Sequence, residues 1–171
     1  DGDPVAVLYD SPRELLVPAL MGDRRPITEV RPALNGYQKG HCFYCYRPIV
    51  VISDSPQPAD VDHFFPHVLM SRGLAIDLDG VWNLVLACRE CNRGEGGKMA
   101  AIPAGEYLEQ LRLRNEYLIW SYHPLRDTLI AQTGQDPTER RQFLSGTWEM
   151  AERLNVKMDW RPLESEQPVI G

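Results

Sequence analysis

The chain has 171 residues, of which 43% are hydrophobic, enough for one domain with a real core or for a small catalytic unit with a helical companion. It has no run of about 18 apolar residues and no charged-then-apolar start, so we expect no membrane span, no secretion signal and a soluble, cytoplasmic protein. The net charge of -6 argues against a surface that coats itself with nucleic acid, because such affinity comes mostly from Lys and Arg.

The charge is unevenly distributed along the sequence. Residues 37–100 hold six Lys and Arg against seven Asp and Glu, so most of the acidity lies outside the segment that carries the candidate site described below. Local potential, and any bound divalent cation, matter more for affinity than the total charge. The sequence opens with Asp1 rather than Met, from which we expect a trimmed chain or a piece of a longer polypeptide with flanking domains.

The first 36 residues are rich in proline, which breaks regular structure and permits only short helical turns such as Arg13 to Val17. We therefore expect an irregular N-terminal segment. A β-rich run over residues 48–53, a turn signal, and a returning strand over residues 59–63 predict a hairpin with a longer loop. Further on, Cys88 to Asn92 are expected to begin a helix that ends near Gly96.

The remainder of the chain is predicted to be helical. Apolar residues at spacings of three and four predict a helix that Pro124 ends, and a short helix over residues 125–133 is closed by Gly134. Asp136, Pro137 and Glu139 fit the N-cap, N1 and N3 positions of a capping box at the start of the last helix. The predicted organisation is an irregular segment (1–36), a core (37–100), a helical region (101–160) and an extended tail (161–171).

All four cysteines lie in two CxxC pairs, Cys42 with Cys45 and Cys88 with Cys91, separated by 42 residues. Two residues between cysteines let both thiolates approach one ion from a tight turn, and two such turns complete a closed tetrahedral zinc site. Two disulfides are the alternative, which the lack of a secretion signal disfavours. A CxxC redox pair would explain only one of the two motifs. We therefore predict a structural Zn²⁺ that joins the hairpin to the helix start.

The segment between and beside the two CxxC pairs also contains the residue types that phosphodiester cleavage needs. These are a base for water, a ligand for a cation at the leaving oxygen, and positive charge near the phosphate. His63 can accept a proton near pH 7. Asp62 and Asn92 offer oxygen ligands suited to Mg²⁺ or Mn²⁺. Arg89, Arg93 and Lys98 lie on or beside the same predicted helix and are expected to contact phosphate.

These motifs together resemble the HNH endonucleases. The resemblance covers residues 37–100 and comprises Cys-x-x-Cys, Asp-His-x-x-Pro, Asn-Leu-Val-Leu-Ala-Cys-x-x-Cys-Asn and a following Lys, in that order. It implies an α+β fold with a ββα-metal core, in which His63 is the general base, Asp62 and Asn92 bind the catalytic ion, and Asn83 holds the loop and orients the histidine. Lys98 sits farther along than in the usual Asn-x-x-Lys.

The resemblance implies hydrolysis of DNA to 5′-phosphate and 3′-hydroxyl ends, in a setting of defence, restriction or mobile elements. A single site cuts one strand, so a double-strand break needs a homodimer or a second event. RNA is an alternative substrate. An alternative of another class is a zinc-stabilised nucleic-acid-binding or scaffold module whose nuclease site is inactive.

Overall fold

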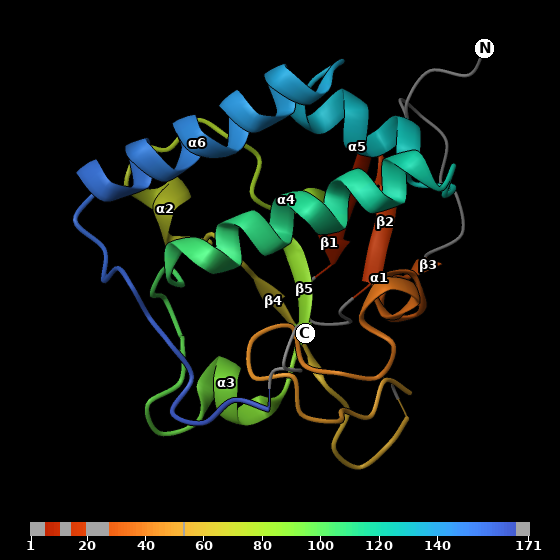
Figure 1. Cartoon of the computed structure of the whole chain (residues 1–171), viewed down its shortest axis with the longest axis vertical. Coiled ribbons are helices and arrows are strands. Elements are labelled where there is room, and N and C mark those ends of the chain that lie inside the picture. Colours follow the sequence, from red (N-terminus) through yellow and green to blue (C-terminus); the bar gives the residue numbers. More distant parts are fainter. Residues whose placement is uncertain (1–5, 11–14, 20–27, 53, 167–171) are drawn as a thin grey trace.

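The computed structural model describes residues 6–10, 15–19, 28–52 and 54–166, and its architecture is mixed α+β (Figure 1). Two strands, β4 (Asp60–His63) and β5 (Leu84–Ala87), lie at its centre and pair antiparallel, with Asp60 opposite Ala87 and His63 opposite Leu84. The short helix α3 (Arg89–Arg93) follows β5 directly.

The predicted hairpin is wrong in its pairing, although its returning strand is present as β4. Residues 48–52 form no strand. Among the described residues, a hydrogen bond from Ala59 N to Val50 O (2.7 Å) is what remains of that pairing, while Pro48 forms an isolated bridge with His41 instead. Two prolines in the intervening loop and Pro48 itself lack the N–H that a ladder requires, whereas β5 is continuous and apolar.

The N-terminal segment is more regular than its prolines predict. Strands β1 (Ala6–Asp10), β2 (Leu15–Ala19) and β3 (Thr28–Glu29) form an antiparallel sheet in that order, where a helical turn was expected over residues 13–17. Pro18 is tolerated because β3 pairs only with Leu15 and Leu16, so Pro18 lies on a stretch of β2 that pairs with β1 alone.

Helix α1 (Val30–Gln38) crosses the predicted boundary between residues 36 and 37 and packs against β5. Pro32 falls in its first turn, where a missing N–H costs little. At its end, the Gln38 side chain donates to Leu86 O (2.7 Å) and accepts from Leu86 N (2.8 Å), so it satisfies the backbone of β5 as a neighbouring strand would. The N-terminal region is therefore continuous with the core.

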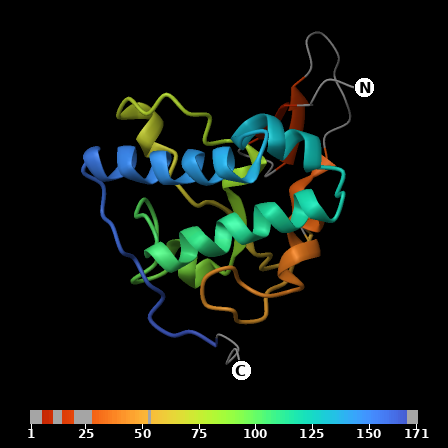
Figure 2. The same cartoon turned by 45° about the horizontal axis from the view of Figure 1, so that its top comes forward.

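Helices α4 (Gly105–Trp120), α5 (Arg126–Thr133) and α6 (Pro137–Arg153) pack against one another, and α4 and α5 contact the turn that precedes β5 (Figures 1 and 2). The predicted ends are confirmed at Gly134, which has a φ of 143°, and at Asp136, whose side chain accepts from Glu139 N at 2.9 Å. Two shorter elements, α2 (Val68–Ser71) and the 3₁₀ turn η1 (Val81–Asn83), lie in the loop between β4 and β5. No helix in the described part of the chain is long and apolar enough to cross a membrane.

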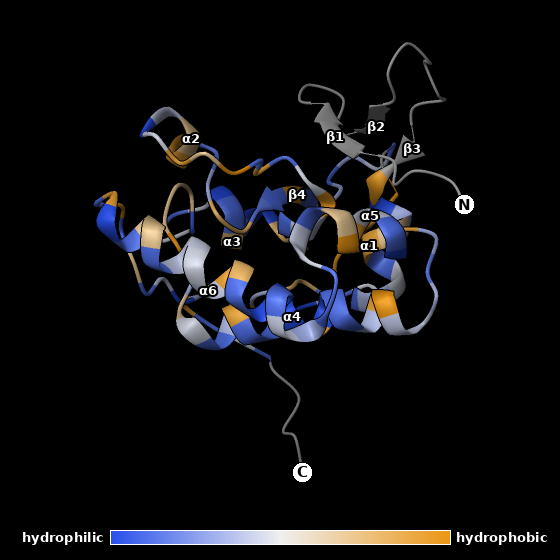
Figure 3. Ribbon diagram, turned by 90° about the horizontal axis from the view of Figure 1, so that it is seen from above, coloured by the Kyte–Doolittle hydropathy of each residue, from blue (hydrophilic) through white to orange (hydrophobic). Residues whose placement is uncertain are grey.

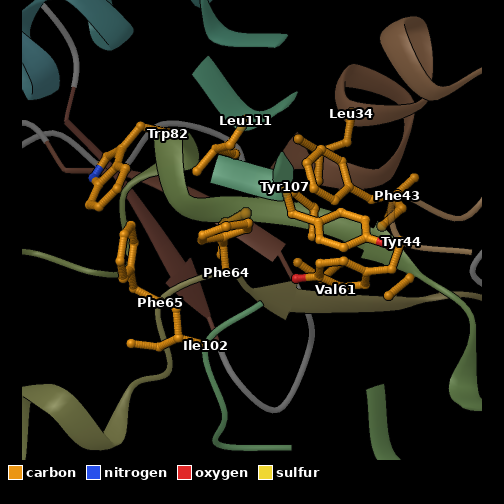
Figure 4. Packing of buried hydrophobic residues seen from close by; sticks show 14 of the residues in the cluster. Leu34, Phe43, Tyr44, Val61, Phe64, Phe65, Trp82, Ile102, Tyr107 and Leu111 are labelled. Atoms are coloured by element: carbon orange, nitrogen blue, oxygen red, sulfur yellow. The ribbon is translucent and has the colours of Figure 1, made fainter. Parts of the chain in front are cut away.

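Hydrophobic and hydrophilic residues alternate along the helices (Figure 3). This pattern is typical of a helix that buries one face in the core and exposes the other to water. That core gathers aromatic side chains around the central strands, with Phe65 packed against Trp82 (ring centroids 5.9 Å apart) and Tyr44 against Tyr107 (5.8 Å; Figure 4). Arg114 of α4 is fully buried beside them and donates to the carbonyl oxygens of Val81, Trp82 and Leu84. It thereby fixes the backbone on both sides of Asn83.

Candidate functional site

The four cysteines form one buried cluster, as predicted. Their Sγ atoms lie within 4.8 Å of one another, and those of Cys45 and Cys88 are 3.7 Å apart. With Zn–S bonds of about 2.3 Å, two sulfurs of a tetrahedral site lie about 3.8 Å apart. Among the described residues this is the only group of three or more His, Cys, Asp or Glu side chains with such geometry. The spacing therefore suits a closed zinc site.

The backbone around the cluster favours thiolates. Cys88 N donates to Cys42 Sγ (3.3 Å), and Cys91 N donates to Cys88 Sγ (3.4 Å), with Cys88 as the N-cap of α3. All four are free thiols, so the disulfide alternative does not describe this structure. Hydrogen bonding with Cys42 lowers the pKa of the Cys45 thiol to about 7, and hydrogen bonding with the same residue raises the pKa of Cys91. Four adjacent thiols ionise together only when a cation offsets their repulsion.

Asn83 connects two segments that follow the predicted catalytic histidine in the chain. Its Oδ1 accepts from Phe65 N (2.8 Å), and its Nδ2 donates to Phe65 O (3.0 Å) and Leu78 O (2.9 Å). Its backbone oxygen also accepts from Phe64 N (2.8 Å). The side chain is fully buried, so these bonds replace all of its hydration. These contacts tie the segment after β4 to the start of β5, and a role for Asn83 beside a catalytic histidine stays a prediction.

His63 ends β4, and its side chain is 14% exposed. Its Nε2 lies 2.9 Å from Asp79 Oδ1, and the same oxygen lies 3.4 Å from Nε2 of His67. Burial lowers the pKa of His63 below the usual 6.5, while the bond to Asp79 opposes that shift. The ring is therefore largely neutral at pH 7, as a general base requires. His67 is 60% exposed.

Asp62 lies on the other face of β4 from His63, because successive strand residues point to opposite sides. Its Oδ2 accepts from the Tyr44 hydroxyl (2.6 Å) and lies 3.3 Å from Lys98 Nζ. Lys98 is 1% exposed and also donates to His63 O (2.7 Å). The expected contact of Lys98 with phosphate is therefore corrected: this cation is buried as the counter-ion of Asp62, where burial lowers its pKa and Asp62 opposes the shift.

Asn92 is placed by Asp60 rather than by Asp62. Its Nδ2 donates to Asp60 Oδ2 (2.9 Å), and Arg93 contacts the same carboxylate through Nε (2.9 Å) and Nη2 (3.1 Å). Asp60 and Asp62 share one face of β4, about 7 Å apart along the strand. Arg93, expected to meet phosphate, is thus ion-paired at the site. Arg89 is exposed, and no ion pair joins it to another described residue.

The oxygens predicted to hold a catalytic divalent ion come from adjacent elements. Asp62 Oδ1 and Asn92 Oδ1 accept no hydrogen bond from the described residues, so each retains an oxygen for a cation. A carboxylate and a carboxamide are the hard donors that Mg²⁺ and Mn²⁺ favour. The oxygens of Asp62 and Asn92 are therefore chemically suited to such an ion. The Lys98 ammonium, however, already neutralises the negative charge of Asp62.

Three residues that contact the predicted site residues were not predicted from the sequence: Asp60, Asp79 and Tyr44. Asp60 carried a usable signal, because Asp60 and Asp62 alternate with Val61 and must share a strand face. Tyr44 lies inside the first CxxC, where no sequence pattern singles it out. Asp79 carried no signal, because it is an acidic loop residue 16 positions beyond His63 in the sequence. Comparisons of the chain with protein-family models, curated proteins and solved structures found no match.

Proposed function

We propose that the chain is a metal-dependent phosphodiesterase of the HNH endonuclease type, with a ββα-metal core and DNA as its substrate. The observation that carries the proposal is the position of His63: a neutral, partly exposed imidazole at the end of β4, beside Asp62 in the chain, in a loop that the buried Asn83 holds. The same strand contacts α3, which carries Asn92. This is the set of groups that water attack on a phosphodiester requires.

Each residue has one role in this proposal. His63 takes a proton from the attacking water. Asn83 fixes the segment that follows that histidine, through Phe65 and Leu78. Asp62 and Asn92 would hold Mg²⁺ or Mn²⁺, which when bound supplies positive charge at the departing 3′ oxygen. The exposed Arg89 contacts a phosphate of the strand. The cysteines, with Zn²⁺, hold α3 against the strands and take no part in the chemistry, because a closed shell leaves no open position.

A specific observation favours a second candidate, a zinc-stabilised nucleic-acid-binding or scaffold module that does not cut. Lys98 already neutralises Asp62, and the amide group of Asn92 is bonded to Asp60. A site whose ligands are satisfied by protein partners gains less from a divalent ion. The two candidates differ in one measurable property, which is metal-dependent cleavage.

The test is incubation of zinc-loaded protein with supercoiled plasmid in Mg²⁺ or Mn²⁺, with and without a chelator. We expect nicked plasmid only with the ion, and a loss of about 10²- to 10⁴-fold in rate for His63→Ala. His67→Ala is the matched control, because it removes a neighbouring exposed imidazole. Products that a ligase reseals contain the predicted 5′-phosphate and 3′-hydroxyl ends.

Equal inertness of the wild type and His63→Ala, with both still binding DNA, would establish the second candidate instead. Labelled RNA in the same assay shows whether the substrate is DNA or RNA. Cleavage of RNA without cleavage of DNA would leave the chemistry in place and change the substrate. Rapid cleavage by His63→Ala would refute the assignment of the base.

A further inference from the structure

Asp79 is the acidic residue nearest to the proposed base, and it comes from the loop between α2 and η1. Its Oδ1 lies 2.9 Å from His63 Nε2, within the range of a charge-assisted hydrogen bond. The two side chains are 26% and 14% exposed, so the pair is largely shielded from water. A hydrogen bond in such surroundings is stronger than the same bond at the surface.

The loop that carries Asp79 is held on both sides. Asp79 N donates to Asp77 Oδ1 (3.0 Å), and Asp77 O accepts from the indole Nε1 of Trp82 (3.1 Å). The adjacent Leu78 O accepts from Asn83 Nδ2 (2.9 Å), and that side chain also binds both backbone groups of Phe65. The same asparagine therefore positions the histidine loop and the carboxylate loop relative to each other.

The chemistry of the pair determines the imidazole tautomer. An ionised carboxylate only accepts hydrogen bonds, so the ring nitrogen facing it must be the protonated one. For His63 this nitrogen is Nε2, and the neutral ring then carries its lone pair on Nδ1.

We propose that Asp79 is a positioning residue that fixes the His63 ring with Nδ1 as the nitrogen that receives the proton from water. This inference rests on the proposed function, in which His63 is the base. Asp79 touches neither substrate nor reacting atoms and acts through the histidine. Its carboxylate also stabilises the imidazolium that forms when the proton arrives.

His67 contacts the same Asp79 oxygen at 3.4 Å, and its ring centroid lies 5.6 Å from that of His63. The longer distance and the 60% exposure of its side chain make it the weaker of the two partners. Removal of His67 therefore leaves the pairing of His63 intact. This residue provides the matched control for a substitution at Asp79.

The first experiment reads the tautomer directly and needs no activity. Long-range ¹H–¹⁵N spectra of zinc-loaded protein, at a pH where His63 is neutral, are compared for wild type, Asp79→Ala, Asp79→Asn and His67→Gln. We expect a protected His63 Nε2–H resonance in wild type and His67→Gln, its loss in Asp79→Ala, and partial retention in Asp79→Asn, whose Oδ1 still accepts. Proton on Nδ1 in wild type, or an unchanged spectrum in Asp79→Ala, overturns the proposal.

The second experiment separates positioning from folding. In plasmid cleavage, Asp79→Ala is expected to lower kcat by about 10- to 100-fold with little change in KM, as for other residues that orient a functional histidine. Asp79→Asn should recover part of this loss, and His67→Gln should match wild type. Equal kcat for Asp79→Ala and wild type contradicts the inference. If the wild type does not cleave, the proposed function fails, and the imidazole spectra alone decide the role of Asp79.

Discussion

Asn83→Ala is expected to destabilise the chain strongly, although it removes only one small polar side chain. Asn83 is fully buried and makes three side-chain hydrogen bonds, with Phe65 N, Phe65 O and Leu78 O. Each bond contributes about 1 kcal/mol net, and a buried group left without its partner costs at least that much. The substitution should therefore cost about 3 kcal/mol, which corresponds to a fall in Tm of about 6–12 °C for a chain of this size.

Urea denaturation of zinc-loaded protein, followed by tryptophan fluorescence, measures this loss. Gln57→Ala is the control, since that side chain is exposed, and its effect should stay within about 0.5 kcal/mol. Asn83→Asp keeps an acceptor for Phe65 N but cannot donate to Phe65 O and Leu78 O, so it should also be destabilising. A loss below about 1 kcal/mol in Asn83→Ala would refute the assignment of these bonds as the connection between the two loops.

Three further perturbations test other parts of the site. Cys88→Ser should abolish stoichiometric zinc in metal analysis and unfold the chain by circular dichroism, because structural zinc contributes about 10 kcal/mol or more, comparable to the stability of a whole domain; a folded, zinc-free variant would contradict this. Lys98→Met leaves Asp62 buried without its ammonium partner and should cost about 3–5 kcal/mol in chemical denaturation, part of which Asp62→Asn in the same chain restores. Cleavage requires neutral His63, whose pKa burial lowers below 6.5, so the rate of cleavage should rise with pH and reach half its maximum below pH 6.5; a half-maximal rate well above pH 6.5 argues against His63 as the base.

Local chemistry made several elements predictable from the sequence. The CxxC pairs gather at one point, as expected of four thiols at a spacing that suits one tetrahedral metal ion. The start of α6 followed from Asp136 and Glu139, whose side chains satisfy backbone N–H groups within one turn. The end of α5 followed from Gly134, which adopts a φ of 143° that other residues rarely adopt.

Strand pairing was not predictable in the same way, because it is decided by residues distant in the sequence. The run at residues 48–52 is apolar and adjacent to β4, so the sequence favoured a hairpin between them. β5 replaces it as the partner because its residues are all buried and its other edge is satisfied by Gln38 of α1. The pairing thus depends on a glutamine 48 residues from Leu86, which no local pattern indicates.

At the candidate site, too, some features were predictable from the sequence and others were not. His63, Asp62, Asn83 and Asn92 could be chosen by residue type and order, but their hydrogen-bond partners could not. Asp79 reaches His63 only because the loop between α2 and η1 folds back over β4. Lys98 is buried because the chain turns inward after α3, with Lys98 N donating to Cys91 O (2.6 Å). The prediction that Lys98 contacts phosphate from the surface was wrong for that reason.

The position of α3 depends on more than zinc. The helix and the loop after it are tied to the strands in three places: by the cysteine cluster, by Asp60 with Asn92 and Arg93, and by Asp62 with Lys98. Two of these ties are ion pairs between a β4 carboxylate and a cation from α3 or its following loop. They neutralise the acidic face of β4 from within, so Asp60 and Asp62 add little net negative charge where a phosphate would approach. The overall charge of -6 is therefore a poor guide to the potential at this site.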